Sequence, residues 1–264
     1  FFCHQLGRIM ELRDKVVVIT GGSGGIGKAM ATAFLREGAK AIMLADLNED
    51  AVNQAAAEIG CDGMACDVTN EAQVAALVEA TETKHGPVDV FCSNAGAGGS
   101  GLLTDADNDV WQQQWELHVM AHLYAARAVI PGMIERGSGY LMNTASAAGL
   151  LAALGSGPYT VTKAAAVKLA EFLAITHGDE GIAVSVLCPQ GVNTAMAPRS
   201  LGDGQTDGII EPSALADTVV EAMRQERFHV LPHPEVEEYV RRKGDNIDRW
   251  LLGMQRLRKR TIEG

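Results

Sequence analysis

Short apolar segments alternate with longer amphipathic segments along most of the chain, and this pattern predicts alternating strands and helices. Residues 16–20 are the run Val-Val-Val-Ile-Thr, and residues 41–45, 88–93, 140–144 and 183–188 are similarly apolar. Continuous apolar runs, as opposed to alternating ones, are typical of strands buried on both faces. The sequence therefore predicts an α/β fold with a doubly wound parallel sheet and helices on both of its faces.

The segments between these strands have helical periodicity. Residues 28–37, 51–59 and 71–85 are predicted helices, and Gly38 is the expected stop of the first. Residues 107–136 predict a long helix that Pro131 bends or breaks, because proline lacks the amide hydrogen that a helix interior needs. Pro158 is expected to open a further helix, since proline is favoured in the first turn.

The domain organisation follows from the absence of an internal repeat or an interdomain linker in the sequence. We interpret residues 10–230 as one domain and residues 1–9, which precede Met10, as an extension. Residues 231–264 predict a C-terminal helical extension packed on the domain. Within it, apolar side chains form one helical stripe that we expect to contact the body or a neighbouring subunit, with membrane-surface binding as the lesser alternative. The stripe consists of Ile247, Trp250, Leu251, Met254 and Leu257.

A glycine-rich turn lies between the first predicted strand and the first predicted helix. Gly21, Gly25 and Gly27 would allow a pyrophosphate to approach the helix N-terminus closely. Asp46 ends the second strand, where a carboxylate can accept hydrogen bonds from the ribose of NAD and would repel the 2′-phosphate of NADP. Leu47, which follows it, adds no positive charge. We therefore predict a site for NAD, with NADP as the alternative.

A second group of polar residues predicts proton transfer. Tyr159 and Lys163 are four residues apart, so on a helix they share one face. A nearby ammonium favours the phenolate and is expected to lower the tyrosine pKa from its ordinary value of about 10. Ser146, thirteen residues upstream of Tyr159, could orient a substrate oxygen beside it.

Composition narrows the classes of function and location. The net charge of −11 argues against nucleic acid as a general partner. No apolar run reaches the length needed to span a bilayer, so no membrane span is predicted. The five cysteines lack zinc-type spacing, which favours reduced thiols in a cytoplasmic protein.

Taken together, these motifs resemble those of the classical short-chain dehydrogenase/reductase family, a single-domain Rossmann family, over about residues 12–196. Thr20-Gly21-x-x-x-Gly25-Ile26-Gly27 is similar to the family's cofactor loop, and Asn94-Ala95-Gly96 to its motif at the end of the fourth strand. The catalytic residues that the resemblance implies are Ser146, Tyr159, Lys163 and His118. The cofactor-binding residues that it implies are Gly21, Ser23, Gly25, Ile26, Gly27, Asp46, Asp67, Val68, Asn94, Ala95, Gly96, Tyr159, Lys163, Pro189, Val192 and Thr194.

The resemblance also implies a reaction and a state of assembly. The expected activity is NAD-dependent interconversion of a secondary alcohol and a ketone, with Tyr159 as general acid and base. The apolar segment after Ser146 favours an apolar substrate. A same-fold epimerase or dehydratase, or a catalytically idle NAD-binding regulator, is the alternative. Family members are usually homodimers or homotetramers built on the helices near residues 107–134 and 158–177.

Two positions depart from the family pattern. The family has an asparagine in the helix after Trp115, where it holds a water that links the lysine to solvent, and His118 stands at that place here. Imidazole can bind the same water but titrates near neutrality, and simple packing in the helix is the alternative role. His118 and His122 lack a third ligand, so no metal site is predicted. Gln190 replaces the usual glycine, and its side chain either touches substrate or points away.

Overall fold

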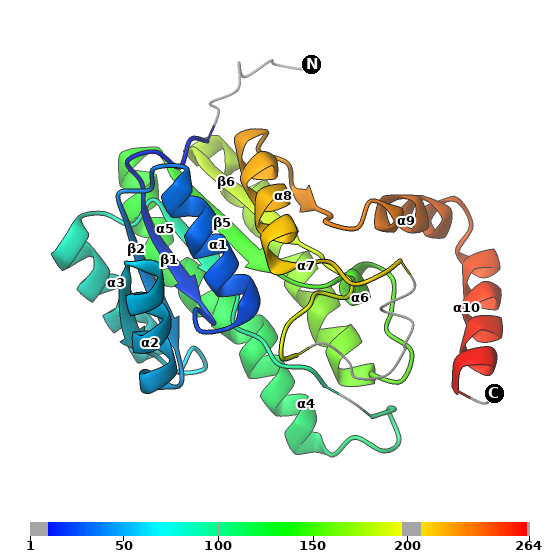
Figure 1. Ribbon diagram of the computed structural model, residues 1–264. Helices are drawn as coiled ribbons and strands as arrows, with labels where there is room; N and C mark the ends of the chain where they lie inside the picture. Colours follow the sequence, from blue (N-terminus) through cyan, green and yellow to red (C-terminus); the bar gives the residue numbers. More distant parts are fainter. Residues whose placement is uncertain (1–9, 100, 197–206, 263–264) are drawn as a thin grey trace.

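A seven-stranded parallel sheet in the order β3-β2-β1-β4-β5-β6-β7 forms the centre of the molecule (Figure 1). The computed structural model describes residues 10–99, 101–196 and 207–262, so the predicted extension at residues 1–9 lies outside it. The elements are β1 (Val16–Thr20), α1 (Gly25–Arg36), β2 (Ala41–Asp46), α2 (Glu49–Ile59), β3 (Asp62–Ala65), α3 (Glu71–His85), β4 (Val90–Ser93), α4 (Asn108–Trp115), η1 (Glu116–Met120), α5 (Ala121–Arg136), β5 (Gly139–Thr144), α6 (Ala147–Leu150), α7 (Gly157–His177), η2 (Gly178–Glu180), β6 (Ile182–Leu187), α8 (Pro212–Arg224), β7 (His229–Val230), α9 (Glu235–Asp245) and α10 (Ile247–Ile262).

The two faces of the sheet carry separate hydrophobic cores, as the apolar strand runs predict. Val18 of β1 belongs to the core formed with α3, α5 and α7. Val17 and Ile19 belong to the core formed with α1, α2 and α8. Because neighbouring strand residues point to opposite faces, a strand covered on both sides needs apolar residues at every position. The predicted single-domain Rossmann fold is confirmed.

The helix predicted at residues 107–136 is continuous and differs in its interior from the prediction. Pro131 lies inside α5 and does not end it. The irregularity lies earlier instead, at η1, a turn of π-helix between α4 and α5. Such a turn holds one residue more than a regular α-helical turn, and it often marks functional positions. Here it carries His118.

The helical run at residues 108–136 is long and apolar enough to cross a membrane when judged by length and composition alone. This differs from the prediction from the sequence. Half of its most apolar window is buried inside the protein, because η1 and α5 lie against α7 and α3 and face the sheet. Burial against neighbouring elements is typical of a core helix.

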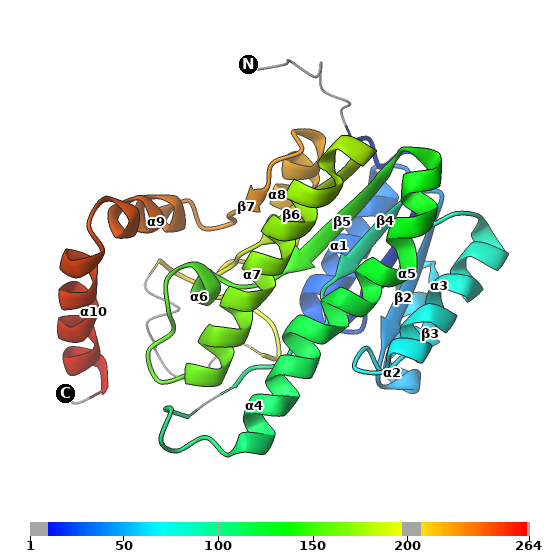
Figure 2. The same ribbon diagram turned by 180° about the vertical axis from the view of Figure 1, so that it is seen from behind.

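The C-terminal helices α9 and α10 stand to one side of the sheet in both views (Figures 1 and 2). The Tyr239 hydroxyl of α9 donates to Asp207 at 2.9 Å, and the Lys243 ammonium donates to the carbonyl of Leu150 in α6. In the apolar stripe of α10, Ile247 and Leu251 are about half exposed, and Trp250, Met254 and Leu257 are partly buried. The body of the same chain therefore covers this stripe only in part.

Candidate active site

The glycine turn between β1 and α1 forms one side of the candidate site. Gly21 has a φ of +64°, which glycine adopts without strain. A Cβ on Gly27 would lie 2.4 Å from the carbonyl oxygen of Gly21, so only glycine fits there. Gly25 and Ile26 are the first residues of α1, three residues earlier than the sequence predicts. A Cβ on Gly25 would lie 2.8 Å from Cγ2 of Thr194, so that predicted cofactor residue also lies beside the turn.

Asp46 reaches the same turn from the end of β2. Its Oδ2 accepts hydrogen bonds from the Ser23 hydroxyl at 2.6 Å and from the Ser23 amide at 3.1 Å. The predicted residues Asp46 and Ser23 are therefore in direct contact, although 23 positions separate them. A fixed carboxylate beside the N-terminus of α1 suits the ribose hydroxyls of a dinucleotide.

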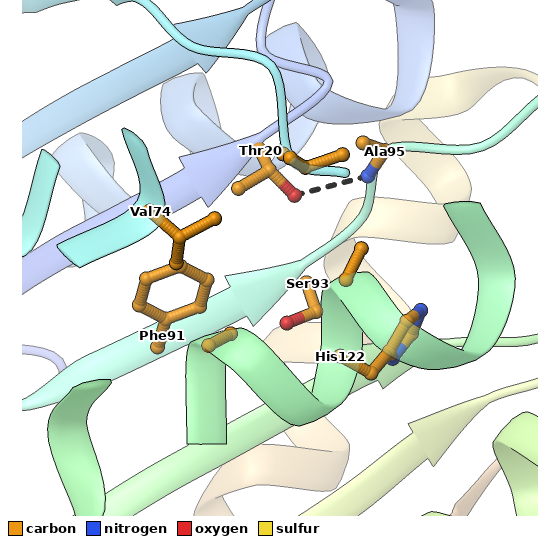
Figure 3. Close-up of a pocket in the computed structure, with 9 residues that line it drawn as sticks. Thr20, Val74, Phe91, Ser93, Ala95 and His122 are labelled. Carbon is orange, nitrogen blue, oxygen red and sulfur yellow. Dashed lines mark hydrogen bonds between the residues drawn. The ribbon is translucent and has the colours of Figure 1, made fainter. Parts of the chain in front are cut away.

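Asn94 ties three strands together at their carboxyl ends. Its amide nitrogen Nδ2 donates to the carbonyl of Thr20 at 3.0 Å, and its Oδ1 accepts from the Thr144 hydroxyl at 3.2 Å. The Thr20 hydroxyl accepts from the backbone amide of Asn94 at 2.9 Å and from that of Ala95 at 3.0 Å, and Figure 3 shows the second of these bonds. Thr20 was predicted as part of the glycine motif and not as a residue that binds the loop after β4. Its place directly before Gly21 could have indicated that function.

A small pocket borders Thr20 and Ala95, and neither Ser146 nor Tyr159 is among its lining residues. Thr20 and Ala95 line one side of it and Ser93 and His122 lie opposite them (Figure 3), and Val68 is also a lining residue. Burial, with a smaller contribution from the charge of Lys163, lowers the pKa of His122 to about 3. His122 is therefore uncharged at neutral pH.

Asp67 and Val68 come shortly after β3, which pairs with β2, the strand that ends at Asp46. One carboxylate oxygen of Asp67 accepts from the Thr69 hydroxyl at 2.7 Å and from the Thr69 amide at 2.9 Å. Val68 is buried in the core and in the pocket wall. These positions border the same edge of the sheet as Asp46.

Ser146, Tyr159 and Lys163 converge from β5, α6 and α7. Ser146 is the N-cap of α6, and its hydroxyl lies 3.4 Å from the carbonyl of Pro189. The Lys163 ammonium is buried, donates to the carbonyl of Thr144 at 3.0 Å and lies 5.8 Å from the centre of the Tyr159 ring. The sequence spacing places Tyr159 and Lys163 together as predicted.

The pKa of Tyr159 differs from the sequence prediction. Burial raises it, and a hydrogen bond with Ser146 partly opposes that rise. The Lys163 ammonium lies over the ring and is directed to a backbone carbonyl, so it does not offset the loss of hydration. Burial also lowers the pKa of Lys163 to about 8. The predicted lowering of the Tyr159 pKa by Lys163 is therefore absent from this structure.

His118 is wholly buried and stands edge-on to Tyr159, with ring centres 5.5 Å apart. Its Nδ1 lies 3.0 Å from the Thr162 hydroxyl, and its Nε2 accepts from the amide of Ala97 at 3.3 Å. Burial, and less strongly the charges of Lys163 and His122, lower its pKa to about 2. Thr162 was not among the predicted site residues, although it lies between Tyr159 and Lys163 in the sequence.

Residues 189–194 follow β6, at the same carboxyl edge of the sheet as Ser146. Pro189 contacts Ser146 as described, and Val192 pairs with Ile210 in an isolated bridge. Gln190 contacts Asp207 through its side chain and His233 through its backbone amide. Asp207 and His233 were not predicted site residues, because they lie 17 and 43 positions from Gln190 in the sequence.

The residues present fit a nicotinamide dinucleotide. The glycine turn leaves no room for a Cβ at Gly27 and exposes a helix N-terminus to phosphate, while Asp46 lies at the ribose position. Gly96 lies close to the acid–base residues, because a Cβ there would lie 3.4 Å from the Lys163 ammonium. Cofactor residues and acid–base residues therefore share one edge of the sheet.

Comparison with known proteins supports this assignment. The family model for short chain dehydrogenase matches residues 15–203. The chain is 32% identical over 256 residues to 1-deoxy-11-beta-hydroxypentalenate dehydrogenase of Streptomyces exfoliatus, covering 90% of each chain. It is 34% identical over 198 residues to 2-(S)-hydroxypropyl-CoM dehydrogenase 3 of Xanthobacter autotrophicus, covering 73% of this chain and 77% of the relative.

Solved structures agree with the sequence relatives. A short chain dehydrogenase/reductase from Burkholderia phymatum in complex with NAD superposes with a TM-score of 0.82 at 29% identity, covering 90% of this chain and 96% of that one. This likeness to a structure that contains NAD, together with the dehydrogenase relatives, supports an oxidoreductase with a nicotinamide cofactor. The chain belongs to the short-chain dehydrogenase/reductase family.

Proposed function

We propose that this protein is an NAD-dependent oxidoreductase that interconverts a secondary alcohol and a ketone, with Tyr159 as general acid and base. The convergence of Ser146, Tyr159 and Lys163 beside the glycine turn carries this proposal. Two relatives are named as dehydrogenases of hydroxylated compounds, which supports an alcohol as the substrate here.

Each residue of this group has a distinct task in the proposed reaction. The nicotinamide, when bound, supplies the hydride chemistry. Tyr159 takes the proton from the alcohol oxygen during oxidation and returns it during reduction. Ser146 donates a hydrogen bond to the same oxygen and holds it beside Tyr159. The ammonium of Lys163, which lies 5.8 Å from the centre of the Tyr159 ring, is proposed to hold the nicotinamide ribose when the cofactor is bound.

The cofactor preference is proposed from Asp46. Its carboxylate is held by Ser23 and has Leu47 as its neighbour, so a 2′-phosphate would meet a negative charge without a cation beside it. The substrate is proposed to be largely apolar, since Leu150, Leu151 and Leu154 follow Ser146 at the end of α6 and in the segment before α7.

Assembly and location are proposed on separate observations. Phe172 and Ile175 on α7 are 64% and 81% exposed, which supports a homodimer or homotetramer that covers this helix. Sedimentation equilibrium measures that state directly. The four described cysteines are free thiols, which supports a cytoplasmic location.

The proposal is tested by comparing Tyr159→Phe with Tyr124→Phe, which removes the same atom from α5. Purified proteins are assayed for reduction of NAD and NADP with a panel of secondary alcohols. Tyr159→Phe is expected to lose nearly all turnover and to keep its affinity for NADH, whereas Tyr124→Phe keeps both. Substantial turnover by Tyr159→Phe contradicts the assignment of Tyr159, and absence of turnover by the unaltered protein with every alcohol and ketone contradicts the proposed reaction.

A further inference from the structure

Gln190 adjoins the acid–base group through its neighbour in the chain. The carbonyl of Pro189 lies 3.4 Å from the hydroxyl of Ser146, which is the residue proposed to hold the substrate oxygen. The side chain of Gln190 therefore starts one residue away from a direct contact of Ser146. A group fixed at this place can touch the part of a substrate next to its reacting carbon.

The orientation of the Gln190 amide is fixed by its partner. Nε2 donates to Oδ2 of Asp207 at 3.0 Å, and a carboxylate can only accept a hydrogen bond. The opposite assignment of nitrogen and oxygen would place two acceptors together. The other carboxylate oxygen, Oδ1, accepts from the Tyr239 hydroxyl at 2.9 Å, so Asp207 is itself held in place.

The backbone of Gln190 is held as well. Its amide donates to Nδ1 of His233 at 3.2 Å, and His233 is buried. Asp207 and His233 thus hold the side chain and the backbone of one glutamine, and Tyr239 holds Asp207. Such a side chain loses little freedom when it binds a ligand, because its conformation is already fixed.

Two buried polar atoms of this group lack a hydrogen-bond partner within the described part of the chain, Oε1 of Gln190 and Nε2 of His233, and only Oε1 belongs to the side chain beside Ser146. A buried acceptor without a donor is costly, and a ligand that supplies the donor removes that cost. An uncharged donor such as a hydroxyl satisfies Oε1 without the cost of burying a charge.

We propose that Gln190 is a specificity-determining residue whose Oε1 accepts a hydrogen bond from a second hydroxyl of the substrate. This inference rests on the proposed function and names the substrate class more closely, as an otherwise apolar diol or hydroxyketone. Gln190 takes no part in proton transfer. Its contribution is to favour substrates that supply a donor over those that leave Oε1 unsatisfied.

The test uses three alcohols that share a secondary hydroxyl. They are 2-butanol, 2,3-butanediol and 1,3-butanediol, and kcat/KM for NAD reduction is measured with the full-length protein. The better diol is expected to exceed 2-butanol by about tenfold or more. Gln190→Met, which keeps the size of the side chain, is expected to bring this ratio close to one.

Lys243→Met serves as the control, because it removes another contact between the C-terminal extension and the site region, the one to the carbonyl of Leu150. A merely structural loss lowers kcat/KM for all three alcohols by the same factor and leaves the ratio unchanged.

The inference is overturned if the wild-type protein does not prefer either diol, or if Gln190→Met keeps the preference. It is also overturned if Gln190→Met weakens NADH binding while the ratio stays constant, since Oε1 would then serve the cofactor. Failure of the proposed function looks different, because no alcohol is then turned over at all.

Discussion

Nδ1 of His118 lies 3.0 Å from the hydroxyl oxygen of Thr162, and this contact determines the state of the histidine. The Thr162 hydroxyl donates to the carbonyl of Pro158 at 2.8 Å, so it accepts from Nδ1–H. Nε2 then carries a lone pair, which accepts from the amide of Ala97. Both nitrogens are used by the protein, and His118 joins the cofactor-side loop to the helix that carries Tyr159.

His118→Leu is therefore expected to lower kcat/KM by about tenfold, because the loop and α7 lose their connection. The pH dependence of kcat/KM between pH 5 and pH 8 is expected to keep its shape, since the His118 pKa of about 2 lies outside this range. The kcat/KM of His118→Asn is expected to lie between those of the wild-type protein and His118→Leu. Disappearance of an ionisation between pH 5 and pH 8 in His118→Leu would instead show that His118 carries protons.

Asp46 is expected to govern the choice between NAD and NADP. The double change Asp46→Asn with Leu47→Arg removes the repelling charge and adds a cation. It should weaken NADH binding and strengthen NADPH binding, each by about tenfold. Titration of protein fluorescence with each nucleotide measures both constants. Asp50→Asn, an exposed position on α2, is the matched control and should change neither. An unaltered ratio of the two affinities in the double variant counts against the role given to Asp46.

Gly27→Ala is expected to damage the cofactor turn. The added Cβ would lie 2.4 Å from the Gly21 oxygen and 2.9 Å from Cα of Gly22, so backbone has to move. A loss of about 1–3 kcal/mol in the free energy of unfolding is expected, together with weaker NADH binding. Gly244→Ala on α9 is the control, because nothing lies within 4 Å of its Cβ. That variant should be neutral or more stable by up to about 1 kcal/mol. Equal behaviour of the two variants in urea unfolding would contradict the geometry.

Lys163 is expected to make stability depend on alkaline pH. Its pKa is about 8 in the folded chain and 10.5 as its ordinary value, so the unfolded chain holds this proton more tightly. The cost of burying the charged ammonium is present below pH 8 and disappears as the pH rises to about 10.5. Stability of the wild-type protein relative to Lys163→Met should therefore rise over this window, by up to roughly 3 kcal/mol. Urea unfolding of both proteins from pH 7 to pH 10.5 measures the difference, and a constant gap would refute the shifted pKa.

The fold was largely predictable because burial on both faces leaves a plain mark on the sequence. The run at residues 16–20 is fully buried, and the helix predicted at residues 71–85 is α3 with the same ends. The π turn at His118 was not predictable, since its extra residue alters the hydrogen bonding of the backbone and not the apolar pattern. Pro131 suggested an irregularity at the wrong place.

The candidate site was predictable only where its residues lie close in the sequence or form a motif. Tyr159 and Lys163 are brought together by helical spacing, and Gly21 and Gly27 by a tight turn. The pKa of Tyr159 depends on burial that no local pattern reveals. The partners of Gln190 come from remote segments, so only the folded chain brings Asp207 and His233 to it.

The π turn η1 also allows one helical rod to serve two different neighbours. One additional residue rotates the side chains on one side of the turn by about 100° relative to those on the other. Before the turn, α4 packs on α7, and after it, α5 packs on α3. The chain thus redirects the contact face of a helix without a loop, and His118 lies at the point where the direction changes.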